Sequence, residues 1–186
     1  YYGAKDFENL RKSLAHSYRL TAFIAAGVLI LSQSFASLVL TGLHTPSNII
    51  GMSLLYLRII FCGIPATAAY NMFASALRAM GNSKTPLTAM IIASVLNVSL
   101  DILFVAGFGW GVAGAAIATV IAQSFSAVYC FLILRRIDIV HLTRADFMPA
   151  SGMNARLMKL GIPVVFQNII IGVGGLVVQY VINGYG

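Results

Sequence analysis

The chain has 186 residues, of which 59% are hydrophobic and only 9% charged, and its formal net charge is +7. A soluble domain covers its surface with about 25% charged residues, so this composition excludes a soluble enzyme, and the high hydrophobicity excludes a disordered chain. Lipid must contact most of the surface. Nucleic-acid binding is not expected either, because it requires basic residues gathered on one face of a folded domain.

Five apolar stretches are long enough to cross a bilayer, whose hydrocarbon core of about 30 Å requires roughly 20 helical residues. In chain order they cover residues 20–40, 52–77, 86–106, 112–134 and 157–182. The strands of an outer-membrane barrel are shorter and alternate in polarity over about 10 residues. The sequence therefore predicts an all-α fold, a polytopic membrane helix bundle of about five transmembrane helices.

The basic residues lie almost entirely on one side of these spans. If the helices alternate in direction, eleven of the twelve Lys and Arg residues lie on the same side: ten in the N-terminal segment, the loop after the second span or the connection after the fourth, and Lys159 at the start of the fifth span. The opposite loops contain none. The twelfth base, Arg58, lies within the second span, near enough to its start to reach the interface. By the positive-inside rule the basic side is cytoplasmic, in a plasma or inner cell membrane.

The longest connection, residues 135–156, differs from its surroundings because it concentrates charged residues, including two of the five acids. We interpret it as a cytoplasmic linker between two bundles. Residues 1–134 then form the membrane helices of the first bundle with a cytoplasmic N-terminal segment, and residues 157–186 open the second. Because the chain starts at Tyr1 and ends within an apolar run, we expect an internal piece of a longer polypeptide whose missing helices it contacts.

Residues 109–114, Gly-Trp-Gly-Val-Ala-Gly, match the G-x-G-x-x-G pattern of dinucleotide-binding proteins. That pattern requires a preceding strand within a βαβ unit, whereas here it separates two membrane spans. The glycines instead favour a tight turn and close packing of the following helix, and Trp110 fits an interfacial anchor. We therefore expect no cofactor.

Asp101 is the one acidic residue within a predicted span. Asn97, four residues earlier, lies on the same helical face. Asn97 and Asp101 precede the turn at Gly109 by 12 and 8 residues, and Thr119 follows it by 10, so a helical hairpin places Thr119 at their depth, with Gln123 one turn deeper. Such polar groups often join neighbouring helices, but an ionisable group within a membrane favours a proton or cation site. Asn97, Asp101 and Thr119 are the candidate ion-coupling residues.

Other residues are candidates for bending or for a substrate path. Pro65 lies within the second span and Pro163 opens the fifth; proline kinks a helix and frees carbonyl groups, which serves either gating or packing. The substrate-path candidates are Tyr70, Asn71, Gln123 and Gln167. Catalysis is not expected, because the spans lack a second carboxylate and a histidine that could activate a serine. The three histidines are far apart in the sequence, so no metal site is predicted.

Several stretches resemble the multidrug and toxic compound extrusion (MATE) transporter family. They are Leu-Arg-Ala-Met-Gly-Asn-Ser-Lys-Thr-Pro at residues 77–86, with residues 56–59 and 63–65 before it, and then residues 96–103, 109–119 and 160–167. The DinF-like, Firmicutes-type branch is the most similar, because Gln167 stands near where some other branches carry an acid.

The resemblance implies twelve membrane helices in two lobes, of which this chain supplies helices three to six, the inter-lobe linker and helix seven. It implies export of drugs or cationic organic compounds by antiport against H⁺ or Na⁺ through alternating access, with ion coupling at Asn97, Asp101 and Thr119. The bilayer and small organic substrates are the expected partners. A lipid-linked oligosaccharide flippase of the same superfamily and a non-transporting membrane scaffold subunit stay open as alternatives.

Overall fold

The computed structural model describes residues 1–42, 48–148 and 152–185, which form helices and turns without a β-strand. In chain order the elements are α1 (Phe7–Gly42), α2 (Ile50–Cys62), α3 (Ile64–Ala79), α4 (Lys84–Asp101), the π-helical η1 (Ile102–Gly107), α5 (Gly111–Arg135), the 3-10 turns η2 (Asp138–Val140) and η3 (Arg144–Phe147), and α6 (Met153–Tyr185). Within this described part, five helical segments are long and apolar enough to cross a membrane. The predicted all-α membrane bundle is confirmed.

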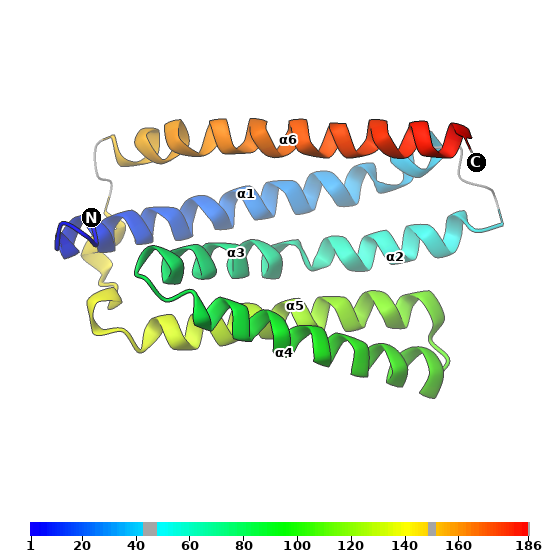
Figure 1. Cartoon of the computed structure of the whole chain (residues 1–186), viewed down its shortest axis with the longest axis horizontal. Coiled ribbons are helices and arrows are strands. Elements are labelled where there is room, and N and C mark those ends of the chain that lie inside the picture. The colour runs from blue at the N-terminus through cyan, green and yellow to red at the C-terminus, as the bar shows by residue number, and fades with distance from the viewer. Residues whose placement is uncertain (43–47, 149–151, 186) are drawn as a thin grey trace. The chain divides into compact units, whose positions relative to one another are not determined.

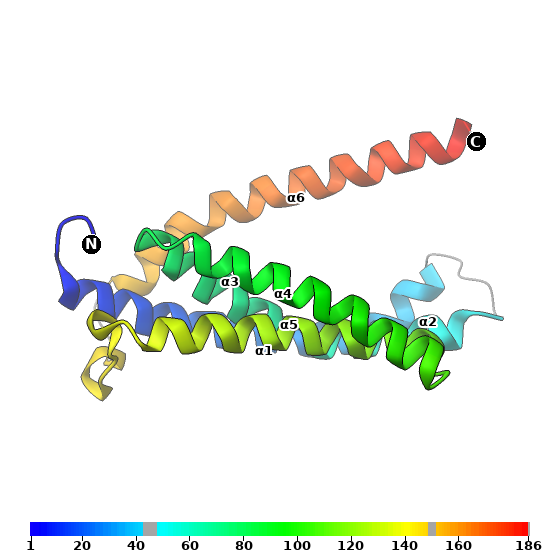
Figure 2. The same cartoon turned by 60° about the horizontal axis from the view of Figure 1, so that its bottom comes forward.

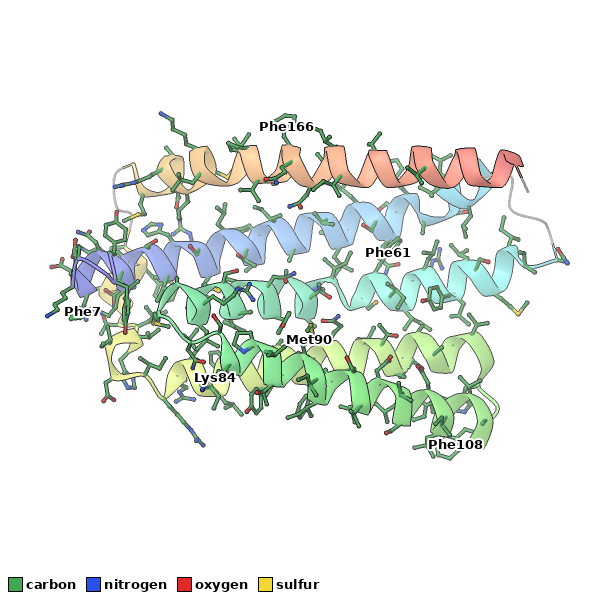
Figure 3. The ribbon with its side chains drawn as sticks, in the orientation of Figure 1. Phe7, Phe61, Lys84, Met90, Phe108 and Phe166 are labelled. Atoms are coloured by element: carbon green, nitrogen blue, oxygen red, sulfur yellow. The ribbon has the colours of Figure 1, made fainter. Side chains whose placement is uncertain are left out.

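The chain divides into two compact units, Tyr1–Phe147 and Met148–Gly186. In the first unit, α5 packs against α2, α3 and α4, while α1 packs against α2 and α3. Both views of the ribbon show α4 running beside α5 (Figures 1 and 2). The second unit contains the single helix α6, whose described side chains, such as Phe166 (Figure 3), are mostly exposed.

Helix α1 begins at Phe7, well before the predicted start of the span, because the charged N-terminal segment has its own helix-stabilising contacts. Asp6 caps the helix: its carboxylate accepts the Asn9 backbone N–H at 3.2 Å and the Asn9 side-chain amide at 2.8 Å. These hydrogen bonds hold the pKa of Asp6 below its usual value. One turn later, Lys12 pairs with Glu8 at 2.6 Å. The charged N-terminal segment and the first predicted span therefore form one continuous helix.

The predicted second span consists of two helices, with a break at Gly63. Pro65 lies in the first turn of α3, where its missing N–H removes no intrahelical hydrogen bond. Proline therefore starts a new helix here rather than kinking a continuous one. Helix α5 lies close to the break: a Cβ at Gly63 would be 3.0 Å from a methyl carbon of Val120 and 3.0 Å from the Ile60 carbonyl oxygen.

Helix α6 differs from the prediction at its start. It begins at Met153, after Gly152 in the left-handed conformation (φ +80°), so the last residues assigned to the linker belong to the helix. Pro163 consequently lies inside α6 instead of opening it. The sequence Met-Asn-Ala-Arg before residue 157 contains good helix formers, and the Arg156 N–H donates to the Gly152 carbonyl at 2.9 Å.

The main cluster of buried apolar side chains joins helices α1, α3, α4 and α5 to η2. Its members are Leu10, Leu14, Ala76, Leu77, Ala89, Cys130, Leu134 and Val140. In Figure 1 the start of α1, the α3–α4 turn and the end of α5 lie at the same end of the first unit. We call this end, which carries Arg11, Arg78, Lys84 and Arg135, the basic end.

Candidate functional site

A cavity of about 210 Å³ lies between α4 and α5, and Tyr70 of α3 also lines it. Its lining is Tyr70, Met90, Ala93, Ser94, Asn97, Thr119, Ala122, Gln123 and Ser126. The lining positions on each helix repeat every three or four residues and so share one helical face. Met90 lies between the two ends of the bundle (Figure 3). The face of α4 that carries Asn97, which the sequence predicts to be polar, lines the cavity. None of the lining residues is charged.

Asn97 and Thr119 are in contact beside this cavity. This agrees with the similar depth predicted from their distances along the sequence to the turn at Gly109. The Asn97 Nδ2 donates to the Thr119 Oγ1 at 3.4 Å, a long hydrogen bond. The Thr119 hydroxyl in turn donates to the Ala115 carbonyl at 3.0 Å within α5. Since that proton is engaged, the Thr119 oxygen is presented to the cavity as an acceptor. The amide oxygen of Asn97 is a second neutral acceptor.

Gln123 and Tyr70 both line this cavity but are held differently. The Tyr70 hydroxyl donates to the Pro86 carbonyl at 3.3 Å, which ties α3 to the start of α4. The Gln123 side chain makes no hydrogen bond to any residue that the structure describes. Gln123 is therefore the lining side chain with the most free donor and acceptor capacity.

Asp101 ends α4, one helical turn after Asn97. Its side chain is half-buried, and its Oδ1 atom is buried without a hydrogen-bond partner among the described residues. A buried carboxylate oxygen without a donor costs about 1–3 kcal/mol or more, so such atoms are rare in structures that have no use for them. Asp101 is not among the residues that line the cavity, although it shares the helical face of Asn97.

The chain continues from Asp101 directly into the π-helix η1, which the sequence analysis did not predict. The Phe108 N–H donates to the Leu103 carbonyl, five residues back, at 2.9 Å. Short π-helices are rare and are frequent at functional sites. Gly114 of the glycine motif makes room for this wider turn: a Cβ there would lie 2.9 Å from the Phe104 Cβ. The glycine spacing indicated close packing at this position but not the π-helix.

The other glycines of the motif form the predicted turn. Gly109 (φ +68°) and Gly111 (φ +53°) both adopt the left-handed conformation that favours glycine. Phe104, Phe108 and Trp110 stack around the turn, with ring centroids 5.1–6.0 Å apart. Trp110 is 50% exposed, as an interfacial anchor requires. Figure 3 shows Phe108 at the end opposite Phe7.

Four other candidates are not among the residues that line this cavity. Asn71 is exposed on α3 and does not line it, and Gln167 and Pro163 are on α6 in the second unit. Pro65 instead lines a separate, mainly apolar cavity of about 360 Å³ between α1 and α3. Gln33 was not among the predicted residues, yet its side-chain amide donates to the Arg58 carbonyl at 2.9 Å and to the Cys62 sulfur at 3.3 Å. An amide side chain within an apolar span could have indicated a contact between helices.

Another contact that was not predicted joins the segment after α5 to α1. Asp146 is 5% exposed, accepts the Thr143 N–H at 2.7 Å and the Thr143 hydroxyl at 2.8 Å, and lies 3.8 Å from the Arg11 Nε. The backbone hydrogen bond from Thr143, assisted by Arg11, holds the pKa of Asp146 below its usual value. Thr143 and Asp146 have the spacing of a capping box, which was a readable sequence signal.

The chain is similar in sequence to known exporters. It is 36% identical over 151 residues to the probable multidrug resistance protein YpnP of Bacillus subtilis, which covers 81% of this chain and 34% of that protein. It is 25% identical to the multidrug export protein MepA of Staphylococcus aureus over 99% of this chain and 41% of that protein. The chain thus spans between a third and a half of the length of these relatives.

Solved structures agree in fold. A MATE crystal structure in the straight conformation aligns with 92% of this chain and 38% of its own, with a TM-score of 0.82 at 23% identity. A multidrug resistance MATE family transporter of the MOP superfamily, in its inward-facing conformation, aligns with 87% of this chain and 37% of its own, with a TM-score of 0.81 at 24% identity. Family members are transporters and not enzymes. Since the MatE family model matches residues 1–103, more than half of the sequence, this multi-pass membrane chain belongs to the MatE (MATE) family.

Proposed function

We propose that this chain is part of a secondary active exporter that moves drugs or cationic organic compounds out of the cell by antiport against H⁺ or Na⁺. The names of YpnP and MepA, a multidrug resistance and a multidrug export protein, support the substrate class. Residues 1–134 would supply helices three to six of a first lobe, residues 135–156 the inter-lobe linker, and residues 157–186 helix seven. The remaining helices would come from the same polypeptide.

The arrangement of basic residues supports a plasma-membrane topology with the basic end in the cytoplasm. In the first unit, the start of α1, the α3–α4 turn and the end of α5 gather at one end (Figure 1). The opposite turn, around Gly109, carries no basic residue. The positive-inside rule assigns the basic end to the cytoplasm.

The observation that carries the proposed mechanism is the buried Oδ1 of Asp101, which has no partner among the described residues. A carboxylate in this position is stabilised either by a proton or by a cation. Asn97, one turn earlier in α4, and Thr119 of α5, to which Asn97 is hydrogen-bonded, offer neutral oxygen atoms that suit Na⁺ or a protonated carboxyl group. In this proposal the ion at Asp101, Asn97 and Thr119 biases the lobe between two conformations, which couples ion entry to substrate release.

The neutral cavity beside this cluster would form part of the substrate path, with Gln123 and Tyr70 as its contact residues. Neutral polar and aromatic walls suit organic cations of varied shape. The flippase alternative would favour a charged cavity, which this lining does not provide. The break at Gly63, next to Pro65, and Pro163 inside α6 would allow the helices to bend during the cycle, and a part for Asn71 or Gln167 in the path stays a prediction.

The proposed coupling role is tested by Asp101→Asn in the full-length transporter, assayed by dye efflux under an imposed H⁺ or Na⁺ gradient. The amide keeps the shape of the side chain but not its charge, so we expect efflux to fall to background while membrane insertion and detergent extraction are unchanged. Ser99→Ala is the matched control, since Ser99 is an exposed polar residue of the same helix that bonds only to the Val95 carbonyl.

Normal efflux by Asp101→Asn would remove Asp101 from the mechanism. A variant that fails to accumulate in the membrane would instead support a structural role, in which the polar groups only join α4 to α5. A loss of efflux in Ser99→Ala as well would show that the assay responds to any polar change in this helix.

A further inference from the structure

A third cavity, of about 280 Å³, lies at the basic end, where α5 ends and the chain turns back toward α1. Its walls include Tyr18 of α1, Phe131, Leu134 and Arg135 of α5, and His141 and Leu142 from the segment after η2. We call these six residues the basic pocket. Three segments far apart in the sequence therefore combine a guanidinium, an imidazole and a phenol with an apolar wall.

The charge of Arg135 in the basic pocket is not neutralised by any residue that the structure describes. Arg135 is exposed and forms no ion pair with any described residue. Of the acids on the adjacent turns, Asp146 is engaged by Thr143 and Arg11, and Asp138, which is fully exposed, lies 3.6 Å from His141. A guanidinium offers five N–H donors in a planar fork that matches a phosphate group. The pocket therefore favours an anion with several oxygen acceptors.

The pocket opens onto apolar surface on its membrane side. Phe131 is 40% exposed, and Val128 and Leu132, which are also exposed, continue the apolar surface along α5. Tyr18 also lines the apolar cavity between α1 and α3, and Tyr18 and Phe131 are joined through Phe73, with ring centroids 5.6 and 5.3 Å apart. An anion bound at Arg135 therefore lies beside apolar surface that suits an attached acyl chain.

We infer that the basic pocket binds the phosphate headgroup of an anionic phospholipid from the leaflet on the basic side of the protein. Arg135 is the principal contact, His141 and Tyr18 complete the polar wall, and an acyl chain lies along the surface that begins at Phe131. Basic pockets between helix ends on the cytoplasmic side of membrane proteins bind anionic headgroups in this way. The inference rests on the proposed topology but not on ion coupling at Asp101.

The apolar wall favours a lipid over a soluble phosphate compound. A soluble anion gains nothing from Phe131 and Leu142, whereas a lipid places its glycerol and chains against them. Because the acyl chain of any phospholipid passes from one apolar environment to another, this contact does not distinguish one lipid from another. Selectivity between lipids must therefore come from the headgroup and Arg135.

The test compares lipid retention by full-length transporter purified from phosphatidylcholine vesicles that contain phosphatidylglycerol. Native mass spectrometry measures the preference for phosphatidylglycerol in the wild type, in Arg135→Gln and in Arg136→Gln, the matched control whose exposed guanidinium does not line the pocket. We expect Arg135→Gln to lower the preference about fivefold, which corresponds to about 1 kcal/mol per basic residue at a membrane surface. Arg136→Gln should change it by less than about twofold, since a charge outside the pocket acts only through screened solvent.

Equal effects of the two substitutions would overturn the inference, because the attraction would then be general to the basic surface. No effect of Arg135→Gln would overturn it as well. If Arg135→Gln does not elute as a monodisperse protein, His141→Gln, on an exposed turn, supplies the same comparison. Soluble glycerol phosphate should not displace the lipid, and displacement would identify a soluble anion as the ligand instead. Asp101→Asn should keep the lipid preference, which separates a failure here from a failure of the transport proposal.

Discussion

Two aspartates of the first unit have opposite surroundings. Asp146, after α5, is buried, and one of its carboxylate oxygens accepts two hydrogen bonds from Thr143 while Arg11 lies near the other. Asp101, at the end of α4, has a buried oxygen that no described residue contacts through a hydrogen bond. Both carboxylates come from a chain with only five acidic residues, yet one is fully partnered by its neighbours and the other is left open.

The difference distinguishes a structural charge from one that is available to a ligand. Asp146 closes a short turn onto α1, and substituting a bound ion for Thr143 and Arg11 would gain nothing. Asp101 gains a partner only from outside the described chain, whether a proton, a cation or a donor on another helix. The comparison therefore predicts that removing the two charges will affect different properties of the protein.

The largest effect on structure should come from Asp146→Ala. It removes two hydrogen bonds to a charged acceptor, so we expect the turn after α5 to lose about 2–3 kcal/mol of local stability, which raises its open population roughly 30- to 150-fold. Limited proteolysis between residues 138 and 152 measures that opening. Asp101→Asn, which breaks no hydrogen bond among the described residues, should leave the cleavage rate unchanged.

The pH dependence of this turn provides an internal check. The folded pKa of Asp146 lies below its usual value of 3.8, so its contribution to stability is complete above about pH 4 and is lost as the pH falls through the lowered pKa. Cleavage by an acid-active protease should therefore be constant down to about pH 4 and rise only below it. A rise between pH 5 and pH 7 would show that another group controls the turn.

The sequence predicted the bundle well, because lipid imposes simple rules. Twenty-residue apolar stretches and the one-sided distribution of Lys and Arg are direct consequences of the bilayer, and they located all five spans. The sequence also predicted that Asn97 and Thr119 lie at the same depth, because residues that are about equally far from a tight turn lie opposite each other. The turn itself could be read from Gly109 and Gly111.

What the sequence did not predict depends on contacts between helices. Met90 and Ser126 line the cavity because α4 and α5 pack at particular rotations, which periodicity alone does not fix. The π-helix after Asp101 depends on packing against Gly114, several residues further along the chain. The sequence predicted a kink at Pro65 instead of a break at Gly63. The close approach of α5 to Gly63 is a tertiary contact, which the sequence alone does not reveal.

An intermediate effect should come from Gly114→Ala, which tests whether packing at the π-helix holds Asp101 in place. The added Cβ would lie 2.9 Å from the Phe104 Cβ and 3.2 Å from its carbonyl carbon, and such overpacking costs about 1–3 kcal/mol. We expect a lower midpoint of thermal unfolding in detergent together with weaker efflux. Gly27→Ala, with open space around the added carbon, is the control and should be neutral. An unchanged midpoint for Gly114→Ala would mean that η1 shifts freely.

The smallest effect should come from Gln33→Leu, which sets the scale for an uncharged polar contact between two spans. The Gln33 amide bridges α1 to the last turn of α2 through the Arg58 carbonyl at 2.9 Å and the Cys62 sulfur at 3.3 Å, just before the break at Gly63. Hydrogen bonds between membrane helices contribute about 0.6 kcal/mol on average, and the leucine replaces the lost contact with apolar packing. We expect a barely lower thermal midpoint and faster labelling of Cys62 by a membrane-permeant maleimide, because its sulfur loses the amide donor. If Gln33→Leu destabilised the protein as much as Asp146→Ala, then the hydrogen bond at the helix break, and not the buried charge, would be the main polar contact of the first unit.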